Sequence, residues 1–500
     1  MLLLTLAVAW GGFGQRLLTR PMWMDELHSW LLVTDGDVGH ALAALADGAD
    51  YNPPTYYLVA RCLAVFGPVS EYRLRLLSLL LTAATAMAVY LIFSRSCSAA
   101  TALGATLFAT SHQLMVLQST ETRFYALWVC LLTWYCWLLT KDISGRRQQW
   151  LQRITLGIIA AAICTTHYFG VISVGLVTVV WTFCNRHSRE SVLVGGGLLV
   201  CSTIAVGCCL PLLQGQKAAL TCATWVKPPT MVGSWEYLWQ FVPMIPFGLC
   251  CGAAFAGWIS RQQPDDGDTA AAPQDLFSKW TSQSTTLACL IAMPAVLIAF
   301  SWLVQPALVN RYAVVAVFAM TPVYAWLLSR ATEAIQNTCV GIAAFLLCLA
   351  VHMAGETWDF NLQKQDELQA MLAELKDSEI VVFEDRIDFW LLNHLHNKES
   401  GAAWYQADFE ADDLRRPSNL RTVQRDVGRR TQKWFPGKFP MKPMAELGNL
   451  EEFVVVPYVD KPFGELRFPE SHTATRLNNR IYRLTRKPLQ SSQSPRTITR

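Results

Sequence analysis

The sequence is short of charge and of cysteines spaced for metal binding. Only 16% of its 500 residues are charged, whereas 52% are hydrophobic and 11% aromatic, which is too apolar for an ordinary soluble enzyme. A net charge of +3 gives no electrostatic basis for nucleic acid binding. The 15 cysteines fall almost wholly within or beside apolar stretches, and no CxxC pairs with a second one. Nucleic acid partners and a zinc site are therefore disfavoured, and a membrane protein is indicated.

The apolar residues are concentrated before residue 354. There the chain repeats apolar runs of helix-spanning length between short polar connections, whereas later sequence mixes charged and apolar residues. This change predicts a membrane domain at 1–354, a soluble domain at 355–490 and a disordered tail at 491–500. The predicted spans are residues 2–18, 74–94, 98–117, 124–140, 153–167, 169–184, 191–212, 237–258, 284–304, 312–329 and 338–354.

Two of these spans leave an alternative open. The first is short enough for a signal peptide, but it lacks a basic start and an Ala-x-Ala-like cleavage site. The stretch 153–184 is long enough for one tilted helix. Two short helices with a turn at Gly170 fit it better.

Basic residues in the short loops 141–153 and 185–190 favour a cytoplasmic position for both loops. With the N-terminus also in the cytoplasm, eleven crossings place the domain at 355–490 outside. Parity then puts five polar or aromatic loop residues on that same outer face: Asp25, Glu121, His167, Trp225 and Arg311. These loops were selected only because they are polar, yet all of them are predicted on the outer face. An active site requires such a convergence.

The outer loop at 19–73 is far longer than a connection between helices needs, and such loops are usually functional. Asp25 and Glu26 open an apolar-periodic stretch within it. An alternative interpretation is therefore a helix N-terminus whose acids complement the helix dipole. Two short motifs follow in the loop, Pro53-Pro54-Thr55-Tyr56-Tyr57 and Phe66-Gly67, and a third, Arg75-Leu76-Leu77-Ser78, opens the next predicted span.

Taken in order with Trp23-Met24-Asp25-Glu26, these motifs resemble those of the GT-C glycosyltransferases that use polyprenyl-phosphate sugars. That superfamily includes protein O-mannosyltransferases and lipid A aminoarabinose transferases, and the match is closest to their bacterial relatives. Later matching motifs are Glu121-Thr122-Arg123-Phe124-Tyr125, Thr166-His167-Tyr168-Phe169 and Arg311-Tyr312. The resemblance covers residues 1–354 and implies an all-α polytopic GT-C fold of about 11 transmembrane helices.

The soluble domain has a different pattern. Leu362 to Leu375 is typical of an amphipathic helix, and residues 379–383 and 452–456 are typical of buried strands. A second helix is predicted near 387–395. We therefore expect a small extracytoplasmic α/β domain, which either faces the acceptor or stabilises the fold.

The resemblance implies displacement at the anomeric carbon of a sugar whose leaving group is polyprenyl phosphate. Such a reaction needs a carboxylate for the acceptor hydroxyl and cations for the departing phosphate. By resemblance Asp25 is the base, and one direct displacement inverts the anomeric centre. Glu121 is assigned to the acceptor or to an arginine of the site. Glu26 is either a supporting partner or a helix-terminal acid without a catalytic role.

Donor phosphate binding is assigned first to Arg311 and then to Arg123 and Arg75. A guanidinium binds two phosphate oxygens at once and stays charged. Family members often carry a basic residue near the first-loop proline, whereas Asn52-Pro53 offers none. The alternative for each arginine is snorkelling toward lipid headgroups. For Glu121 and Arg123 together, the alternative interpretation is an interfacial charge pair that contributes little to stability.

Substrate contacts are predicted for one histidine and several aromatic residues. His167 lies in apolar sequence, where a lone histidine is more often a hydrogen-bonded structural residue. The aromatic residues either stack on sugar rings or are interfacial aromatics, which membranes enrich. Trp225 belongs to a second long outer loop at 213–236, predicted to be a lid over the donor. The full predicted set is Tyr56, Tyr57, Tyr125, His167, Trp225 and Tyr312.

The resulting prediction is a cell (inner) membrane enzyme that moves a sugar to a lipid, glycan or protein acceptor. No cofactor is expected. A divalent cation is compatible with the sequence but not required, because two separated acids make a poor cage. A transporter should show inverted repeats and ionisable residues near helix centres, whereas these charges cluster at outer ends. A lipid-linked oligosaccharide ligase and a non-catalytic envelope-assembly scaffold stay open; an inert scaffold should tolerate Asp25→Asn.

Overall fold

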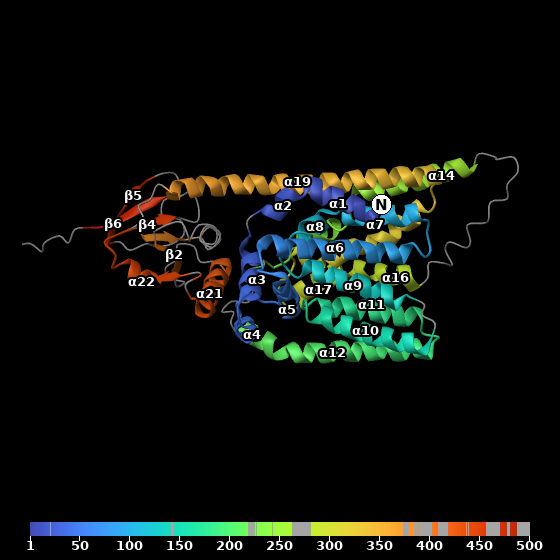
Figure 1. Cartoon of the computed structure of the whole chain (residues 1–500), viewed down its shortest axis with the longest axis horizontal. Helices are drawn as coiled ribbons and strands as arrows, with labels where there is room; N and C mark the ends of the chain where they lie inside the picture. The colour runs from blue at the N-terminus through green and yellow to red at the C-terminus, as the bar shows by residue number, and fades with distance from the viewer. Residues whose placement is uncertain are drawn as a thin grey trace, which may run out of the picture. The chain divides into compact units, whose positions relative to one another are not determined.

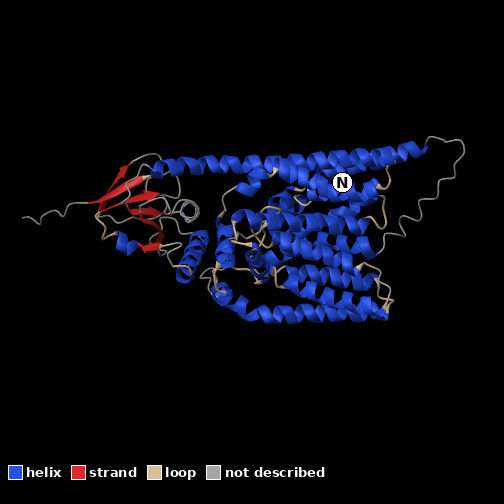
Figure 2. Cartoon of the chain, viewed as in Figure 1, coloured by secondary structure: helices blue, strands red, loops and turns tan. Residues whose placement is uncertain are grey.

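A computed structural model of the chain divides into two compact units, Met1–Ala219 with Ala223–Phe360, and Leu220–Cys222 with Asn361–Arg500. Figure 2 shows the first unit as helical, and every strand among the described residues belongs to the second. The structure describes residues 1–20, 22–141, 145–218, 226, 228–242, 244–262, 282–373, 380–384, 389, 403–408, 419–436, 438, 440–456, 471–477 and 481–487.

The first unit is built from helices, many of which run alongside one another (Figure 1). The earlier ones are α1 (Leu2–Val8), η1 (Ala9–Phe13), α2 (Gln15–Thr19), α3 (Met24–Thr34), α4 (Val38–Ala46), α5 (Thr55–Arg61), η2 (Cys62–Phe66), α6 (Glu71–Phe93), α7 (Ala99–Thr110), α8 (Gln113–Gln118) and α9 (Tyr125–Leu139). The later ones are α10 (Arg146–Cys164), α11 (Gly170–Cys184), α12 (Arg189–Ala218), α13 (Met231–Trp239), α14 (Met244–Gln262), α16 (Ser282–Ala288), η3 (Cys289–Ala292), α17 (Met293–Leu303), η4 (Asn310–Met320), α18 (Thr321–Leu328) and α19 (Glu333–Ala373).

Each of the eleven predicted spans is mostly helical, although 2–18, 98–117 and 237–258 are each divided between separate helices. Among the described residues, however, only five helical stretches are long and apolar enough to cross a membrane. A sixth is added if α13 and α14, bent by 52°, form one span. Several others, such as α7, α9 and α11, are apolar but have fewer than the roughly 20 residues that a bilayer core requires. The five stretches are Glu71–Phe93, Arg189–Ala218, Ser284–Leu303, Asn310–Leu328 and Glu333–Glu356.

A turn at residues 165–169 separates α10 from α11, whose first residue is Gly170, and this confirms the predicted pair of short helices. The two helices pack against each other across a tight turn. A Cβ at Gly170 would lie 2.3 Å from the carbonyl oxygen of Ile163, so the turn needs a residue without a side chain. This turn presents His167 and its neighbours between the ends of the two helices.

The long first loop folds into the helices α3, α4 and α5. The Asp37 side chain accepts a hydrogen bond of 2.7 Å from the Gly39 N–H and caps α4. Arg61, on α5, donates to the carbonyls of Leu32 and Asp35 at 2.9 and 2.6 Å, at the C-terminal end of α3. These caps hold the loop as a folded unit, so it presents its acidic residues from defined positions.

The second unit contains a six-stranded mixed sheet in the order β3-β2-β1-β4-β6-β5. The sheet pairs β1, β2, β3 and β4 in parallel, whereas β6 runs antiparallel to β4 and β5. β1 and β4 are buried and confirm both predicted strands and the small α/β domain. The elements are β1 (Ile380–Phe383), β2 (Ala403–Asp408), α21 (Asn419–Trp434), β3 (Met441–Pro443), α22 (Met444–Leu447), β4 (Glu452–Val456), β5 (His472–Arg476) and β6 (Tyr482–Arg486).

Other predictions for this unit are tested only in part. Residues 362–373 of the predicted amphipathic helix lie in α19. Of the second predicted helix, near 387–395, only Phe389 is described. The predicted tail at 491–500 lies outside the described residues.

Candidate functional site

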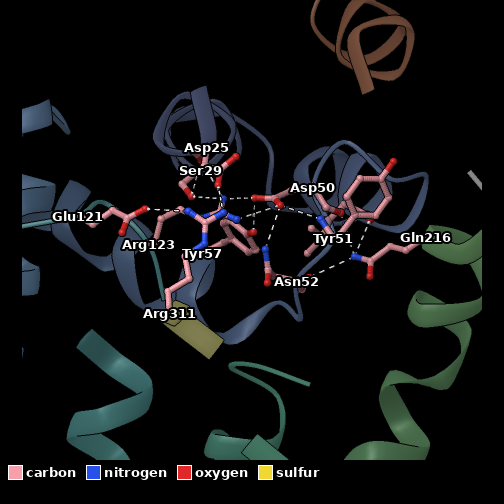
Figure 3. A network of polar contacts seen from close by, with 11 residues as sticks. Asp25, Ser29, Asp50, Tyr51, Asn52, Tyr57, Glu121, Arg123, Gln216 and Arg311 are labelled. Carbon is pink, nitrogen blue, oxygen red and sulfur yellow. Dashed lines mark hydrogen bonds and ion pairs between the residues drawn. The ribbon is translucent and has the colours of Figure 1, made fainter. Parts of the chain in front are cut away.

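The first turn of α3 places Asp25 beside Arg311 at the start of η4 (Figure 3). Arg311 Nη2 lies 2.7 Å from Asp25 Oδ2, and Arg311 Nη1 lies 3.7 Å from Glu121 Oε1. The side chains of Asp25 and Arg311 are each 18% exposed, and that of Glu121 is 9% exposed. The fold therefore brings together two acids and one arginine from three distant segments, and Asp25 and Arg311 stay partly exposed there.

The neighbouring acid, Glu26, points elsewhere, because successive residues of a helix are rotated by about 100°. Arg20 binds its carboxylate with both terminal nitrogens, at 2.6 and 2.9 Å. The backbone N–H groups of Thr122 and Trp23 donate at 2.8 and 3.0 Å, and Arg75 lies at 3.5 Å. Glu26 is fully buried. Its surroundings fit a structural partner and not a group that meets the acceptor.

Arg75 belongs to the same buried cluster. Its guanidinium donates to the carbonyl of Leu18 at 3.2 Å and to the carbonyl of Arg20, and its side chain is 1% exposed. The sequence predicted a donor phosphate ligand here. The burial and the partners of Arg75 point instead to charge compensation for Glu26.

Arg123 forms a second buried cluster with Asp50. Its Nη1 contacts Asp50 Oδ2, Ser29 Oγ at 3.0 Å and the backbone carbonyl of Asp25 at 2.8 Å. The side chains of Arg123 and Asp50 are 6% and 7% exposed. Tyr57 O–H also donates to Asp50, at 2.7 Å. Arg123, predicted to bind phosphate, thus holds the first turn of α3 in place.

Sequence reasoning did not single out Asp50. One signal for it was available, because an arginine in a buried segment needs an acidic partner. Asp50 stands just before the Asn52-Pro53-Pro54 motif in the loop that carries Asp25. Within that loop, Asn52 Nδ2 also donates to Asp50 at 3.0 Å. The pairing with Arg123 spans 73 residues and becomes visible only in the fold.

His167 lies in an aromatic cage. Its ring stacks on Phe124 with centroids 4.6 Å apart and contacts Trp128 at 4.7 Å and Tyr312 at 5.4 Å. Its buried Nδ1 has no hydrogen-bond partner among the described residues. Such a ring packs against its aromatic neighbours and can orient them.

The predicted substrate-binding aromatic residues differ in their surroundings. Tyr56 and Tyr57 are 1% and 3% exposed and pack edge to face inside the first loop. Tyr125 is also buried and lies beneath Arg311, whose guanidinium carbon is 5.8 Å from the ring centroid. Trp225 lies outside the described residues. The burial of these three tyrosines favours supporting roles over stacking on a sugar.

The two acids that share Arg311 have opposite electrostatic environments. Burial would raise the pKa of Asp25, but the charges of Arg311 and Arg123 outweigh it and hold that pKa below its ordinary value. For Glu121, burial prevails over the attraction of Arg311 and raises the pKa. Its Oε1 also lacks a hydrogen-bond partner among the described residues. Two carboxyls with separated pKa values are the arrangement that supports distinct acid and base roles.

We expect Glu121→Gln to raise the Tm at neutral pH. Because the fold raises the pKa of Glu121, the carboxyl ionises more readily in the unfolded chain, and ionisation costs the folded state stability above the ordinary pKa of 4.5. The Tm difference from the wild type should be near zero below that pH and grow until the raised pKa is passed. Thermal unfolding in detergent between pH 4 and 8 measures it, with the exposed Glu236→Gln as control. A pH-independent difference would contradict the assignment.

Known proteins resemble the chain in one part of its sequence and in its fold. Residues 50–213 match the family model described as dolichyl-phosphate-mannose-protein mannosyltransferase. Two structures of ArnT from Cupriavidus metallidurans, one bound to undecaprenyl phosphate and one in the apo state, are similar to the chain. Each aligns with a TM-score of 0.57 at 13% identity, covering 96% of this chain and 97% of that chain. The chain therefore has the fold of these ArnT structures.

The similarity in fold confirms the predicted all-α polytopic membrane fold with its small α/β domain. The family match spans Asp50, Glu121, Arg123 and His167, whereas Asp25 and Arg311 lie outside it. No curated protein sequence matches the chain. Among its described residues, no group of three or more His, Cys, Asp or Glu side chains is placed to hold a metal ion.

Proposed function

We propose that this chain is a GT-C glycosyltransferase, which transfers a sugar from a polyprenyl-phosphate donor to a lipid, glycan or protein acceptor at the extracytoplasmic face. One observation carries the proposal. Asp25 and Arg311 are in contact at 2.7 Å and are both 18% exposed, whereas the Asp50–Arg123 and Glu26–Arg20 pairs are buried. A base and a cation are thus available side by side. The undecaprenyl phosphate in one similar ArnT structure supports a donor of this class.

Arg311 is the proposed ligand of the donor phosphate. In the free enzyme it neutralises Asp25 and keeps the pKa of that acid low, which makes Asp25 a weak base. A phosphate that engages Arg311 replaces part of this attraction by repulsion, so the pKa of Asp25 rises on donor binding. Donor binding therefore activates the base, and Asp25 stays a poor base while the donor site is empty.

The proposed reaction is one direct displacement. Asp25 accepts the proton of the acceptor hydroxyl, whose oxygen forms a bond to the anomeric carbon. The bond from that carbon to the phosphate oxygen breaks, and its electron pair leaves with polyprenyl phosphate. Arg311 stabilises the charge that grows on this leaving group. The anomeric configuration is inverted.

Glu121 has a separate proposed role. Its raised pKa favours the protonated form, which can donate a hydrogen bond to a phosphate or sugar oxygen. Glu26 and Arg123 act behind these groups by fixing the first turn of α3. The catalytic contacts are thereby assigned to Asp25, Glu121 and Arg311.

The membrane setting of the site is part of the proposal. Asp25, Glu121 and Arg311 lie together at one end of the apolar stretch Asn310–Leu328. We place this end at the extracytoplasmic face of the inner membrane, with the N-terminus in the cytoplasm and the α/β domain outside. A polyprenyl chain then remains in the bilayer while its phosphate reaches Arg311.

Mass spectrometry of purified protein with polyprenyl-phosphate hexoses, pentoses and uronates, and with envelope acceptors, tests the reaction. We expect the wild type to consume one donor and release polyprenyl phosphate. Arg311→Gln should lower this turnover by roughly 10²–10³-fold, as expected for loss of a charge-stabilising donor. Lys217→Gln removes an exposed charge from α12 and should leave turnover unchanged.

Three results would change the proposal. Release of polyprenyl diphosphate would identify a ligase of lipid-linked oligosaccharides. Equal turnover by the wild type and Arg311→Gln would exclude Arg311 as the phosphate ligand. No consumption of any donor with acceptors present would favour a non-catalytic scaffold.

A further inference from the structure

Gln216, near the end of α12, binds the first loop with its side-chain amide (Figure 3). Its Nε2 donates to the backbone carbonyls of Leu45, Asp50 and Asn52 at 3.2, 3.1 and 3.2 Å. Its Oε1 accepts a hydrogen bond of 2.6 Å from the Tyr168 hydroxyl. Gln216 is 2% exposed. One buried side chain therefore joins α12, the turn before α11 and the loop between α4 and α5.

Gly215 provides a second, independent sign that this contact is built closely. A Cβ on Gly215 would lie 2.4 Å from the carbonyl oxygen of Ala46, so α12 approaches the end of α4 at a distance that only glycine allows. Gly207 lies two turns earlier in α12, and a Cβ there would meet nothing within 4 Å. The close approach is thus local to the end of α12.

The segment that Gln216 holds also carries Asp50. The Asp50 carboxylate receives Arg123, and Arg123 in turn donates to Ser29 Oγ and to the backbone carbonyl of Asp25. Continuous contacts therefore run from Gln216 through residues 45–52 and Arg123 to the first turn of α3. Asp25 meets Arg311 at the end of this chain of contacts.

We propose that Gln216 is a positioning residue, which sets the place of Asp25 relative to Arg311 by holding Asp50 under Arg123. This inference rests on the proposed function of the Asp25–Arg311 site. It adds that a residue outside the first loop, Gln216, holds that site in place. Gln216 itself touches no substrate. Because a displacement of about 1 Å at a reacting group costs roughly 10²-fold in rate, its loss should lower kcat by about 10- to 100-fold. The KM for the donor should change little, since Arg311 stays in place.

Gln216→Leu and Gly215→Ala are the test variants. Leucine keeps the volume of the side chain but removes its donors, whereas alanine pushes α12 away from Ala46. Gln214→Leu, at an exposed position, and Gly207→Ala are the matched controls on the same helix. Hydrogen–deuterium exchange of the intact, donor-free protein reports on residues 45–52 and 23–29, and steady-state kinetics report on kcat and KM.

We expect both test variants, but neither control, to speed exchange in residues 45–52 and in residues 23–29, with Tm within a few degrees of the wild type. kcat should fall in the same two variants. Faster exchange at 45–52 without a change at 23–29, or unchanged kcat in both variants, would overturn the proposal. A general rise of exchange throughout the chain would also overturn it, because that result indicates a merely structural role.

Failure of the proposed function would look different. If the wild type transfers no sugar, the exchange experiment still decides whether Gln216 positions the first turn of α3. In that case, faster exchange at residues 23–29 in the two test variants still supports the positioning role of Gln216. The site would then serve an activity other than sugar transfer. Unchanged exchange at residues 23–29 in both test variants would overturn the inference, whether or not the wild type is active.

Discussion

Asp25→Asn should lower the turnover of the donor by roughly 10²–10⁴-fold, the range expected for loss of a general base. Asparagine keeps the size of the side chain, and its amide oxygen still accepts a hydrogen bond from Arg311. It cannot take the proton of the acceptor hydroxyl. The donor phosphate, held by Arg311, should bind about as well as before or better. We therefore expect the loss in kcat and not in the KM for the donor.

Donor-consumption kinetics of purified Asp25→Asn, with its Tm as a check of folding, measure this prediction. Asp37→Asn is the matched control, since it makes the same chemical change at an exposed position of the same loop. Asparagine caps a helix as well as aspartate does, so α4 should be undisturbed. Turnover by Asp25→Asn within a few-fold of the wild type would remove Asp25 as the base and favour the scaffold alternative.

Glu26→Gln should act on stability, with an expected loss of about 3–5 kcal/mol in the free energy of unfolding. The carboxylate is fully buried and compensates Arg20 at 2.6 and 2.9 Å and Arg75 at 3.5 Å. Glutamine leaves both guanidinium groups buried with less compensation. The NH₂ group of the glutamine would also face the N–H donors that bind the Glu26 carboxylate, and these donors would lose an acceptor.

The pH dependence of this loss has a definite sign. Burial would raise the pKa of Glu26, but Arg20, Arg75 and the N–H of Thr122 together lower it. The stabilisation is therefore complete above the ordinary pKa of 4.5 and is lost as the pH falls through the lowered value. The difference between the wild type and Glu26→Gln should accordingly shrink in strong acid.

Denaturant unfolding in detergent, at neutral and acidic pH, tests the Glu26 prediction. Glu356→Gln breaks an exposed pair with Arg16, whose side chains are 51% and 54% exposed, and should cost at most about 1 kcal/mol. Similar losses in the two variants would show that the buried cluster carries no special weight. If Glu26→Gln unfolds too readily to be purified, Glu26→Asp offers a milder form of the same test.

Asp25 and Glu26 thus separate activity from stability at adjacent positions. Asp25→Asn should give a folded protein with little turnover, and Glu26→Gln a protein of lower stability. If the folded fraction of Glu26→Gln is counted, its turnover should stay closer to the wild type than that of Asp25→Asn. The reverse pattern would exchange the roles of the two acids.

Much of the architecture follows from local patterns in the sequence. Apolar periodicity located helix at all eleven predicted spans, and Gly170 located the turn between α10 and α11. The apolar runs at 379–383 and 452–456 located β1 and β4. Such features depend on neighbours within a few turns or strand residues, so one sequence is enough to recognise them. The sequence motifs likewise selected Asp25, Glu121 and Arg311, which the fold brings together.

The division of roles within the site was decided by tertiary structure. The sequence left the role of Glu26 open, and the fold encloses it between Arg20 and Arg75. Asp25, the adjacent residue, faces Arg311, 286 residues away. Asp50 and Gln216 gain importance only through partners such as Arg123 and the carbonyls of the first loop. Whether a charge is buried and paired or open to a ligand depends on which distant segments pack around it. Local propensity carries no information on that packing, so the sequence alone named the acids and arginines but not their partners.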